Sequence, residues 1–118
     1  MVTRVAVAST MAILVACSST PSLDEYPCPE AGTTLTYENF GRPFMDAWCN
    51  ECHSEPEGAR QGAPADVRFD NLAGVRRWDD RIFARSALDR VSMPPGLGDP
   101  PRADRDRLAE WLACGAPE

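Results

Sequence analysis

The sequence predicts an all-α fold, and three observations support this prediction. Apolar residues recur at helical spacing in several short segments, and no segment keeps the alternation of apolar and polar residues that marks a half-buried strand. Proline and glycine are concentrated in the connections between these segments. The chain has 118 residues, of which 43% are hydrophobic and 25% charged, a length and composition typical of one globular domain.

The boundaries of the expected helices follow from local signals. The first helix is expected over residues 42–52, with Pro43 in its first turn, where the missing N–H costs nothing. Asp70 is the expected cap of a short second helix, and Asp79 with Asp80 is the expected cap of a third. The last helix is expected over residues 102–113.

The inner faces of these helices follow from the spacing of their apolar residues. In chain order the expected inward residues are Phe44, Met45, Trp48, Leu72, Val75, Phe83, Ala84, Ala87, Leu88, Val91, Leu108, Trp111 and Leu112.

Charge and histidine content exclude several classes of function. All twelve basic residues are arginine, and eighteen acids give a net charge of −6, so the chain is poorly suited to bind the phosphates of nucleic acids. His53 is the single histidine of the chain. A catalytic pair of imidazoles, a cluster of histidine ligands and a two-histidine iron site are therefore excluded within one chain.

The N-terminus has the features of an export signal. Arg4 precedes a mostly apolar stretch, 5–16, that is too short for a permanent membrane span. The residues Leu14-Val15-Ala16-Cys17 resemble a bacterial lipoprotein box, in which the cysteine is lipidated and becomes the first residue of the mature protein. The alternative is an ordinary secretory signal that contains a cysteine.

These features divide the chain into three parts. Residues 1–16 are the expected signal peptide, residues 17–30 a flexible tether rich in serine, proline and acids, and residues 31–118 the folded domain. Export places the domain in an oxidising compartment. Because Ser18 and Ser19 lack the aspartate associated with inner-membrane retention, the lipoprotein resemblance favours the outer membrane, with the domain facing the periplasm.

Cys49, Cys52 and His53 form a C-x-x-C-H motif, which is typical of c-type haem attachment. The two thiols add to the two vinyl groups on one edge of the porphyrin, and the next residue places an imidazole under the iron. A redox dithiol and half of a zinc site are the alternatives. The dithiol would need a βαβ context, and zinc would need a further strong ligand although the chain has no second histidine.

Met93 is the expected sixth ligand of the iron. No other histidine exists, and a thioether is then the usual choice. Met93 precedes Pro94 and Pro95, which stiffen the loop that would hold its side chain. Met45 lies on the apolar face of the first helix and is expected to fill the core, and an incidental surface position for Met93 is the remaining alternative.

With these motifs the mature domain resembles a class I cytochrome c, from about residue 37 to residue 113. In that family a glycine and an aromatic residue of the first helix pack against an aromatic residue of the last, and Gly41, Phe44 and Trp111 match these roles. The family also uses a proline carbonyl to accept the N–H of the proximal imidazole, which the resemblance assigns to Pro64. Trp78 or a nearby arginine could contact the haem propionates.

The resemblance implies one covalent haem c and a function in electron transfer rather than an enzyme activity. A haem held by His53 and Met93 has both axial positions filled, which suits a membrane-tethered one-electron carrier with transient redox partner proteins. The net charge of −6 would favour a basic rim on such a partner. Two alternatives are a haem sensor or accessory subunit with a labile Met93, and a non-redox envelope lipoprotein that binds zinc.

A disulfide is expected by subtraction. Of five cysteines, Cys17 is assigned to lipid and two to haem, which leaves Cys28 and Cys114 as one possible intramolecular pair in an oxidising compartment. Cys28 lies shortly before the first expected helix and Cys114 at the end of the last, and the resemblance implies that these two helices pack together. The alternatives are that Cys28 stays free or that either thiol pairs between molecules.

Overall fold

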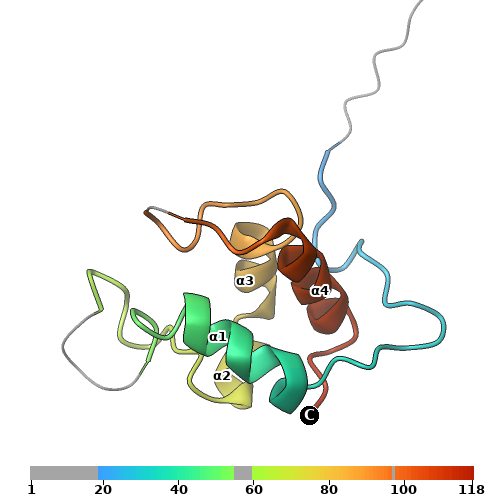
Figure 1. Ribbon diagram of the computed structural model, residues 1–118, viewed down its shortest axis with the longest axis horizontal. Coiled ribbons are helices and arrows are strands. Elements are labelled where there is room, and N and C mark those ends of the chain that lie inside the picture. The colour runs from blue at the N-terminus through green and yellow to red at the C-terminus, as the bar shows by residue number, and fades with distance from the viewer. Residues whose placement is uncertain (1–18, 55–59, 97) are drawn as a thin grey trace, which may run out of the picture.

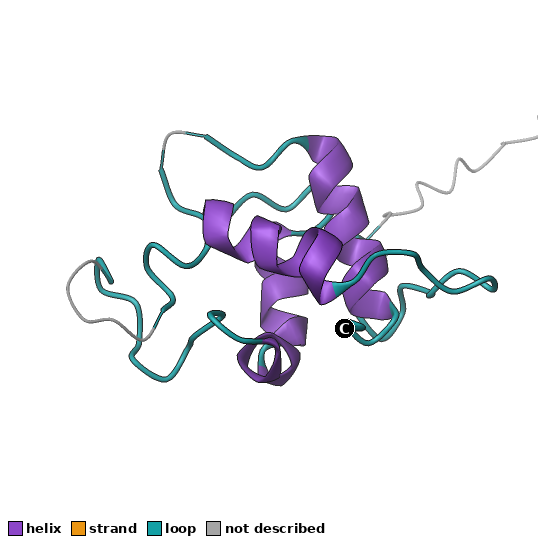
Figure 2. Cartoon of the chain, turned by 60° about the horizontal axis from the view of Figure 1, so that its bottom comes forward, coloured by secondary structure: helices purple, strands orange, loops and turns teal. Residues whose placement is uncertain are grey.

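The computed structural model describes residues 19–54, 60–96 and 98–118, and within these ranges the chain forms helices and no strand (Figure 1, Figure 2). This confirms the all-α prediction for the described part of the chain. The predicted signal peptide and Cys17 lie outside the described residues. The elements are, in chain order, a π-helical turn η1 (Tyr37–Gly41), α1 (Arg42–Trp48), α2 (Leu72–Arg77), α3 (Asp79–Ser86) and α4 (Arg102–Ala113).

The first helical element is a capped turn that continues into α1. Thr36 caps η1: its hydroxyl accepts a bond from the backbone of Asn39 (3.1 Å), and its backbone N–H donates to the Asn39 side chain (2.7 Å). α1 ends at Trp48 rather than at the predicted residue 52. The backbone N–H groups of Cys49 and Asn50 both donate to the carbonyl of Met45, which closes the helix and turns the chain.

The second helix begins one residue later than predicted. Asn71, and not Asp70, caps α2, because its side-chain oxygen accepts a hydrogen bond from the backbone N–H of Gly74 at 2.8 Å. Gly74 has no room for a side chain, since a Cβ at this position would collide with the backbone carbonyl of Arg68. The close approach of these two segments therefore requires glycine.

α3 is shorter than its apolar pattern suggested, and two predicted core residues face solvent. The prediction that Asp79 and Asp80 cap this helix was wrong, because both lie inside its first turn and Trp78 occupies the N-cap position. The helix ends at Ser86, because Ala87 takes an extended conformation (φ −93°, ψ 154°). Ala87 and Leu88 are buried as predicted, but Val91 is 44% exposed because it no longer lies on a helical face. Ala84 is also exposed, so its assignment to the inner face was wrong.

α4 has the predicted bounds and carries the centre of the core. Trp111 is fully buried, and its ring packs so closely on Gly41 that a Cβ at that position would collide with it. This confirms the predicted contact between Gly41 and Trp111. The aromatic ring that meets Trp111 edge-on is that of Phe40 (centroids 6.1 Å apart), while Phe44 packs on Phe40. The fully buried large side chains are Trp111, Phe83, Met45, Leu108, Leu112, Val75 and Pro100.

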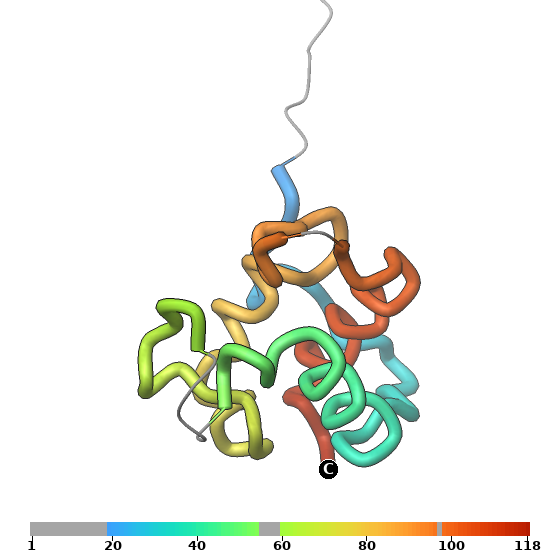
Figure 3. Tube along the Cα trace, turned by 60° about the vertical axis from the view of Figure 1, so that its left-hand side comes forward, coloured from blue at the N-terminus to red at the C-terminus, as the bar shows by residue number. Residues whose placement is uncertain are grey.

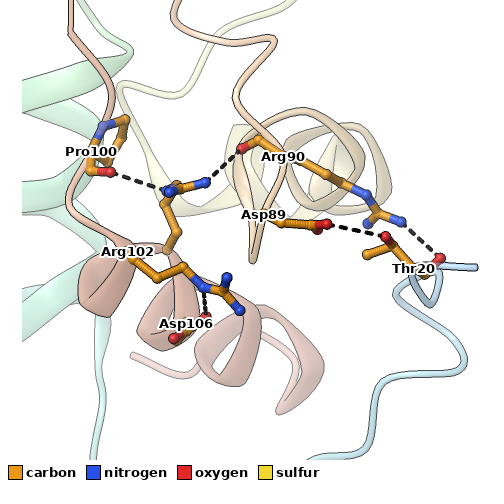
Figure 4. A network of polar contacts seen from close by, with 7 residues as sticks. Thr20, Asp89, Arg90, Pro100, Arg102 and Asp106 are labelled. Atoms are coloured by element: carbon orange, nitrogen blue, oxygen red, sulfur yellow. Dashed lines mark hydrogen bonds and ion pairs between the residues drawn. The ribbon is translucent and has the colours of Figure 1, made fainter. Parts of the chain in front are cut away.

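The segment 17–30, predicted as a flexible tether, contacts the rest of the domain at Thr20, Pro21 and Tyr26. The guanidinium of Arg90 donates to the carbonyl oxygens of Thr20 (3.1 Å) and Pro21 (2.8 Å), contacts that Figure 4 shows for Thr20. The ring of Tyr26 packs against that of Phe83, with centroids 5.6 Å apart. The segment has the composition of a linker, but two kinds of contact hold it in place. Arg90 binds two of its backbone carbonyls, and the ring of Tyr26 packs on that of Phe83.

Cys28 and Cys114 are paired, with their Cα atoms 4.8 Å apart, as predicted. The pair joins the N-terminal segment to the end of α4. The Thr33 hydroxyl adds a hydrogen bond to the Glu110 carboxylate at 2.6 Å on the same side of the molecule.

Candidate functional site

A cavity of about 490 Å³ lies between the turn after α1, the segment 60–69, α3 and the loop after α3, and its wall contains every residue that the sequence assigned to a cofactor. The turn after α1 contributes Cys49, Cys52 and His53, the following segment contributes Pro64, and the α3–α4 loop contributes Met93. Its volume falls in the range of pockets for small molecules and cofactors, about 300–1,000 Å³. The remaining lining residues are Trp48, Glu51, Arg60, Gln61, Gly62, Ala63, Val67, Phe69, Trp78, Arg81, Ile82, Arg85, Ser86, Pro94 and Pro95.

Figure 3 shows how distant segments surround this region. The turn after α1 (green), the segment that follows it (yellow-green), α3 and the loop after α3 (orange) lie around one side of the molecule, whereas α4 lies on the other. Residues far apart in the sequence therefore share one cavity.

Two hydrogen bonds form the turn that presents the two thiols. The backbone N–H groups of Cys52 and His53 both donate to the carbonyl of Cys49, at 3.2 and 2.9 Å. Both cysteines are free thiols and half-buried. Burial raises the pKa of the Cys49 thiol to about 12, so this thiol is neutral at physiological pH.

His53 is held from two sides. Its Nδ1 lies 2.9 Å from the carbonyl oxygen of Val67, which can only accept, so Nδ1 carries a proton, and in the neutral imidazole Nε2 is the nitrogen with the free lone pair. The ring packs on Phe69 with centroids 4.8 Å apart, and the Phe69 N–H donates to the His53 carbonyl at 2.7 Å. The carbonyl at Nδ1 is therefore that of Val67, and the assignment of this role to Pro64 was wrong.

The physical reason is a turn between the two residues. The Pro64 carbonyl accepts a hydrogen bond from the Val67 N–H at 3.2 Å, and this turn brings Val67 under the imidazole. Pro64 still lines the cavity. Val67 could not be found from the sequence, because a backbone carbonyl leaves no signature in residue type.

The backbone of Met93 is tied to the last turn of α3. Its N–H donates to the Arg85 carbonyl (3.2 Å), and its carbonyl accepts from the Ser86 hydroxyl (3.0 Å). Its side chain is half-buried at the cavity wall. Ser86 is the one buried polar residue of the described core, and a polar residue on the apolar face of α3 was the signal that sequence reasoning missed.

The other candidate methionine, Met45, is fully buried in the core, which confirms its predicted structural role. It does not line the cavity.

Arginines dominate the charge at the cavity wall. Arg81 and Arg85 lie one turn apart on α3, both exposed, and neither forms an ion pair within the described residues. Trp78 also lines the cavity, and its indole N–H donates to the Asp66 carbonyl at 3.3 Å. The two guanidinium groups can therefore contact carboxylates of a bound ligand, whereas the indole N–H is already engaged.

A zinc site would require three or four converging side-chain ligands. In the described parts of the chain, no three histidine, cysteine, aspartate or glutamate residues lie close enough together to hold a metal ion. A c-type haem has a different requirement, since the two cysteines bond to carbon and one imidazole binds the iron.

None of the helices in the described residues is long and apolar enough to cross a membrane. Comparisons with protein-family models, with curated proteins and with solved structures find no match for this chain.

Proposed function

We propose that this protein is a monohaem c-type cytochrome that carries single electrons in the bacterial cell envelope. The observation that supports the proposal best is the shared cavity. Its wall contains the C-x-x-C-H motif on one segment and Met93 on another, forty residues away in the sequence (93 − 53).

The donor set fits a haem. Cys49 and Cys52 would form the two thioether bonds, His53 would bind the iron through Nε2, and the Met93 thioether would be the second protein ligand of the iron. The Val67 carbonyl holds the proton on Nδ1, which fixes the tautomer and orientation of the proximal ring and raises its basicity. A haem held by these residues would supply one-electron transfer.

The remaining wall supports the same group. Val67, Phe69 and Ile82 give an apolar surface, and such a surface, with a methionine ligand, raises the reduction potential. The exposed guanidinium groups of Arg81 and Arg85 would face the two carboxylates that every haem carries. The covalent attachment, the axial ligands and these charges together would hold the group in one orientation.

The tie between Met93 and α3 favours the electron carrier over a haem sensor with a labile Met93. Two backbone hydrogen bonds restrain the residue that would have to leave the iron before a gas could bind. Carbon monoxide added to the reduced protein should therefore bind slowly or not at all. Rapid and complete binding would favour the sensor.

The partners would be redox proteins that contact the haem edge transiently. We also propose export by residues 1–16 and a lipid anchor on Cys17, which would place the domain on the periplasmic side of a membrane, with the outer membrane favoured.

The decisive experiment is a pyridine haemochrome assay on the chain expressed with a c-type haem maturation system. The expected result is one covalent haem per chain, retained after acid extraction. Cys49→Ala with Cys52→Ala should lose it, whereas Met93→Leu should keep the haem and lose the weak far-red band of methionine-ligated ferric haem. Absence of covalent haem from the wild-type chain would contradict the proposal.

A further inference from the structure

The point at which the N-terminal segment leaves the domain is fixed by several contacts. Arg90 donates to the carbonyls of Thr20 and Pro21, and its guanidinium lies over the ring of Phe83, 5.3 Å from the centroid. Glu25 accepts hydrogen bonds from both the backbone N–H and the hydroxyl of Ser22, each at 2.9 Å, which holds the following turn. The chain is therefore part of the folded domain from Thr20 onward.

The length of chain between this point and the proposed anchor is short. Cys17 and Thr20 are three residues apart, and three fully extended residues span at most about 11 Å. A lipid on Cys17 would therefore hold the end of the domain around Thr20 close to the bilayer surface. A flexible tether of the predicted length, 17–30, would have left the domain free to turn.

The same end of the molecule carries the loop between α3 and α4. In Figures 1 and 3 this loop (orange) and the start of the described chain (blue) lie at one end, and α2 and the C-terminus lie at the other. Val91, directly after Arg90, is the one large hydrophobic side chain exposed in the described part of the chain. Pro95, further along the loop, is also exposed. An exposed apolar side chain near a short lipid anchor provides a second, weaker contact to a membrane.

We propose that this end, which comprises Thr20, Arg90 and the loop through Val91 and Pro95, rests on the lipid surface into which the acyl chains of Cys17 insert. The inference depends on the lipid anchor of the proposed function. It deepens that function by placing the Met93 side of the cavity toward the membrane. The side formed by the turn 49–53 is then left for a soluble redox partner.

The test uses the lipidated, haem-loaded full chain in vesicles of phosphatidylethanolamine and phosphatidylglycerol that contain a nickel-chelating lipid. A nitroxide-bearing amino acid replaces Val91 or, as the matched control, the exposed Ala73 on α2. The protein is kept reduced so that the low-spin iron is diamagnetic, and nickel-free vesicles give the baseline. Nickel should enhance nitroxide relaxation several-fold more at position 91 than at position 73. Equal enhancement at both positions, or more at 73, would overturn the proposal.

Two variants test the cause of this orientation. Arg90→Gln removes the bonds to Thr20 and Pro21, and a Gly/Ser insertion of about ten residues between Ser18 and Ser19 lengthens the free chain without touching them. Both should bring the ratio of the two relaxation enhancements close to one. If the ratio is unchanged in both variants, the short chain between Cys17 and Thr20 does not set the orientation of the domain.

Two measurements on the same preparations separate this proposal from the electron-transfer proposal. Mass spectrometry of the N-terminal peptide reports the lipid on Cys17, and a haemochrome assay reports the haem. Haem without lipid would contradict the anchor and the docking together. Lipid without haem would contradict the electron carrier, while the relaxation ratio would still decide the docking.

Discussion

Two sides of this molecule differ in what their apolar side chains contact. On the packed side, which comprises η1, α1, α4 and the segment 19–36, rings and aliphatic side chains meet each other, and Trp111 and Met45 have no exposed surface. On the cavity side, which comprises residues 49–53, 60–69 and 93–95 with Trp48 at the end of α1, the side chains of Val67 and Phe69 line a hollow of about 490 Å³. α3 lies between the two sides, with Phe83 in the core and Ile82 at the cavity.

The comparison shows how a small chain divides its limited apolar surface. A domain of this size buries a smaller fraction of its surface than a large one, and protein interiors are normally packed without sizeable voids. The packed side meets this requirement with protein atoms alone and adds the Cys28–Cys114 pair. Under the proposed function, the haem would complete the core on the cavity side. Five variants would break or sharpen this contrast.

Trp111→Ala should have the largest effect, because it removes the ring at the centre of the packed side. The ring contacts Gly41 and Phe40, and its indole N–H donates to the Pro117 carbonyl at 3.1 Å. We expect a loss of about 3–5 kcal/mol in the free energy of unfolding, measured by denaturant titration of the haem-loaded protein. A loss below 1 kcal/mol would show that the packed side does not carry the fold.

Replacing both Cys28 and Cys114 by serine should cost about 2–4 kcal/mol of unfolding free energy, since the closed loop is long. The haem spectrum of the folded variant should stay unchanged, because neither residue lines the cavity. Reduction of the wild-type chain by a mild reductant is the matched comparison and should give the same loss. A haem spectrum of the folded double variant that differs from that of the wild type would show that the packed side and the cavity side are coupled.

Ser86→Ala tests the link between α3 and the Met93 loop. The variant removes the 3.0 Å hydrogen bond to the Met93 carbonyl and should cost about 0.5–1.5 kcal/mol. In the loaded protein, carbon monoxide should bind faster to the reduced form. Ser92→Ala is the control, because its exposed hydroxyl makes only a 3.4 Å contact to the Arg85 carbonyl. Equal rates in both variants would exclude a role for Ser86 in holding the loop.

Arg85→Gln should lower the reduction potential. A positive charge at the cavity wall disfavours the ferric state, so its removal stabilises that state. For a partly solvated charge the reduction potential should fall by about 20–40 mV. Arg42→Gln removes the same charge from a residue that pairs with Glu38 and does not line the cavity, and should shift the potential less. Voltammetry at low ionic strength measures both. Equal shifts would show that Arg85 acts only through net charge.

Asp79→Asn should have the smallest effect. Burial, with the neighbouring charges of Asp80 and Asp24, raises the pKa of Asp79, so ionisation of this carboxyl costs stability as the pH rises through that pKa. The variant should gain a few tenths of a kcal/mol at pH 7, and the gain should vanish below the ordinary pKa of aspartate. Asp104→Asn is expected to change stability in the opposite direction, because Asp104 pairs with Arg107 at 3.3 Å. A loss of stability in Asp79→Asn at pH 7 would contradict this account.

Much of the fold could be predicted because its signals are local. The bounds of α4 follow from Pro101 and the apolar period of the helix, and Pro43 marks the first turn of α1. The features that were predicted wrongly from the sequence depend on a neighbour distant in the sequence or on the course of the backbone. The segment 17–30 has the composition of a linker, yet Arg90 and Phe83 supply the partners that hold it.

The candidate site divides in the same way. Residue type and spacing alone predicted Cys49, Cys52, His53 and Met93 as site residues, because the proposed thioether attachment and iron ligation would require particular side chains. Only the tertiary structure placed these residues around one cavity and assigned the carbonyl of Val67 to His53. A backbone carbonyl is the same in every residue, so its role is decided by where the chain turns and not by which amino acid stands there.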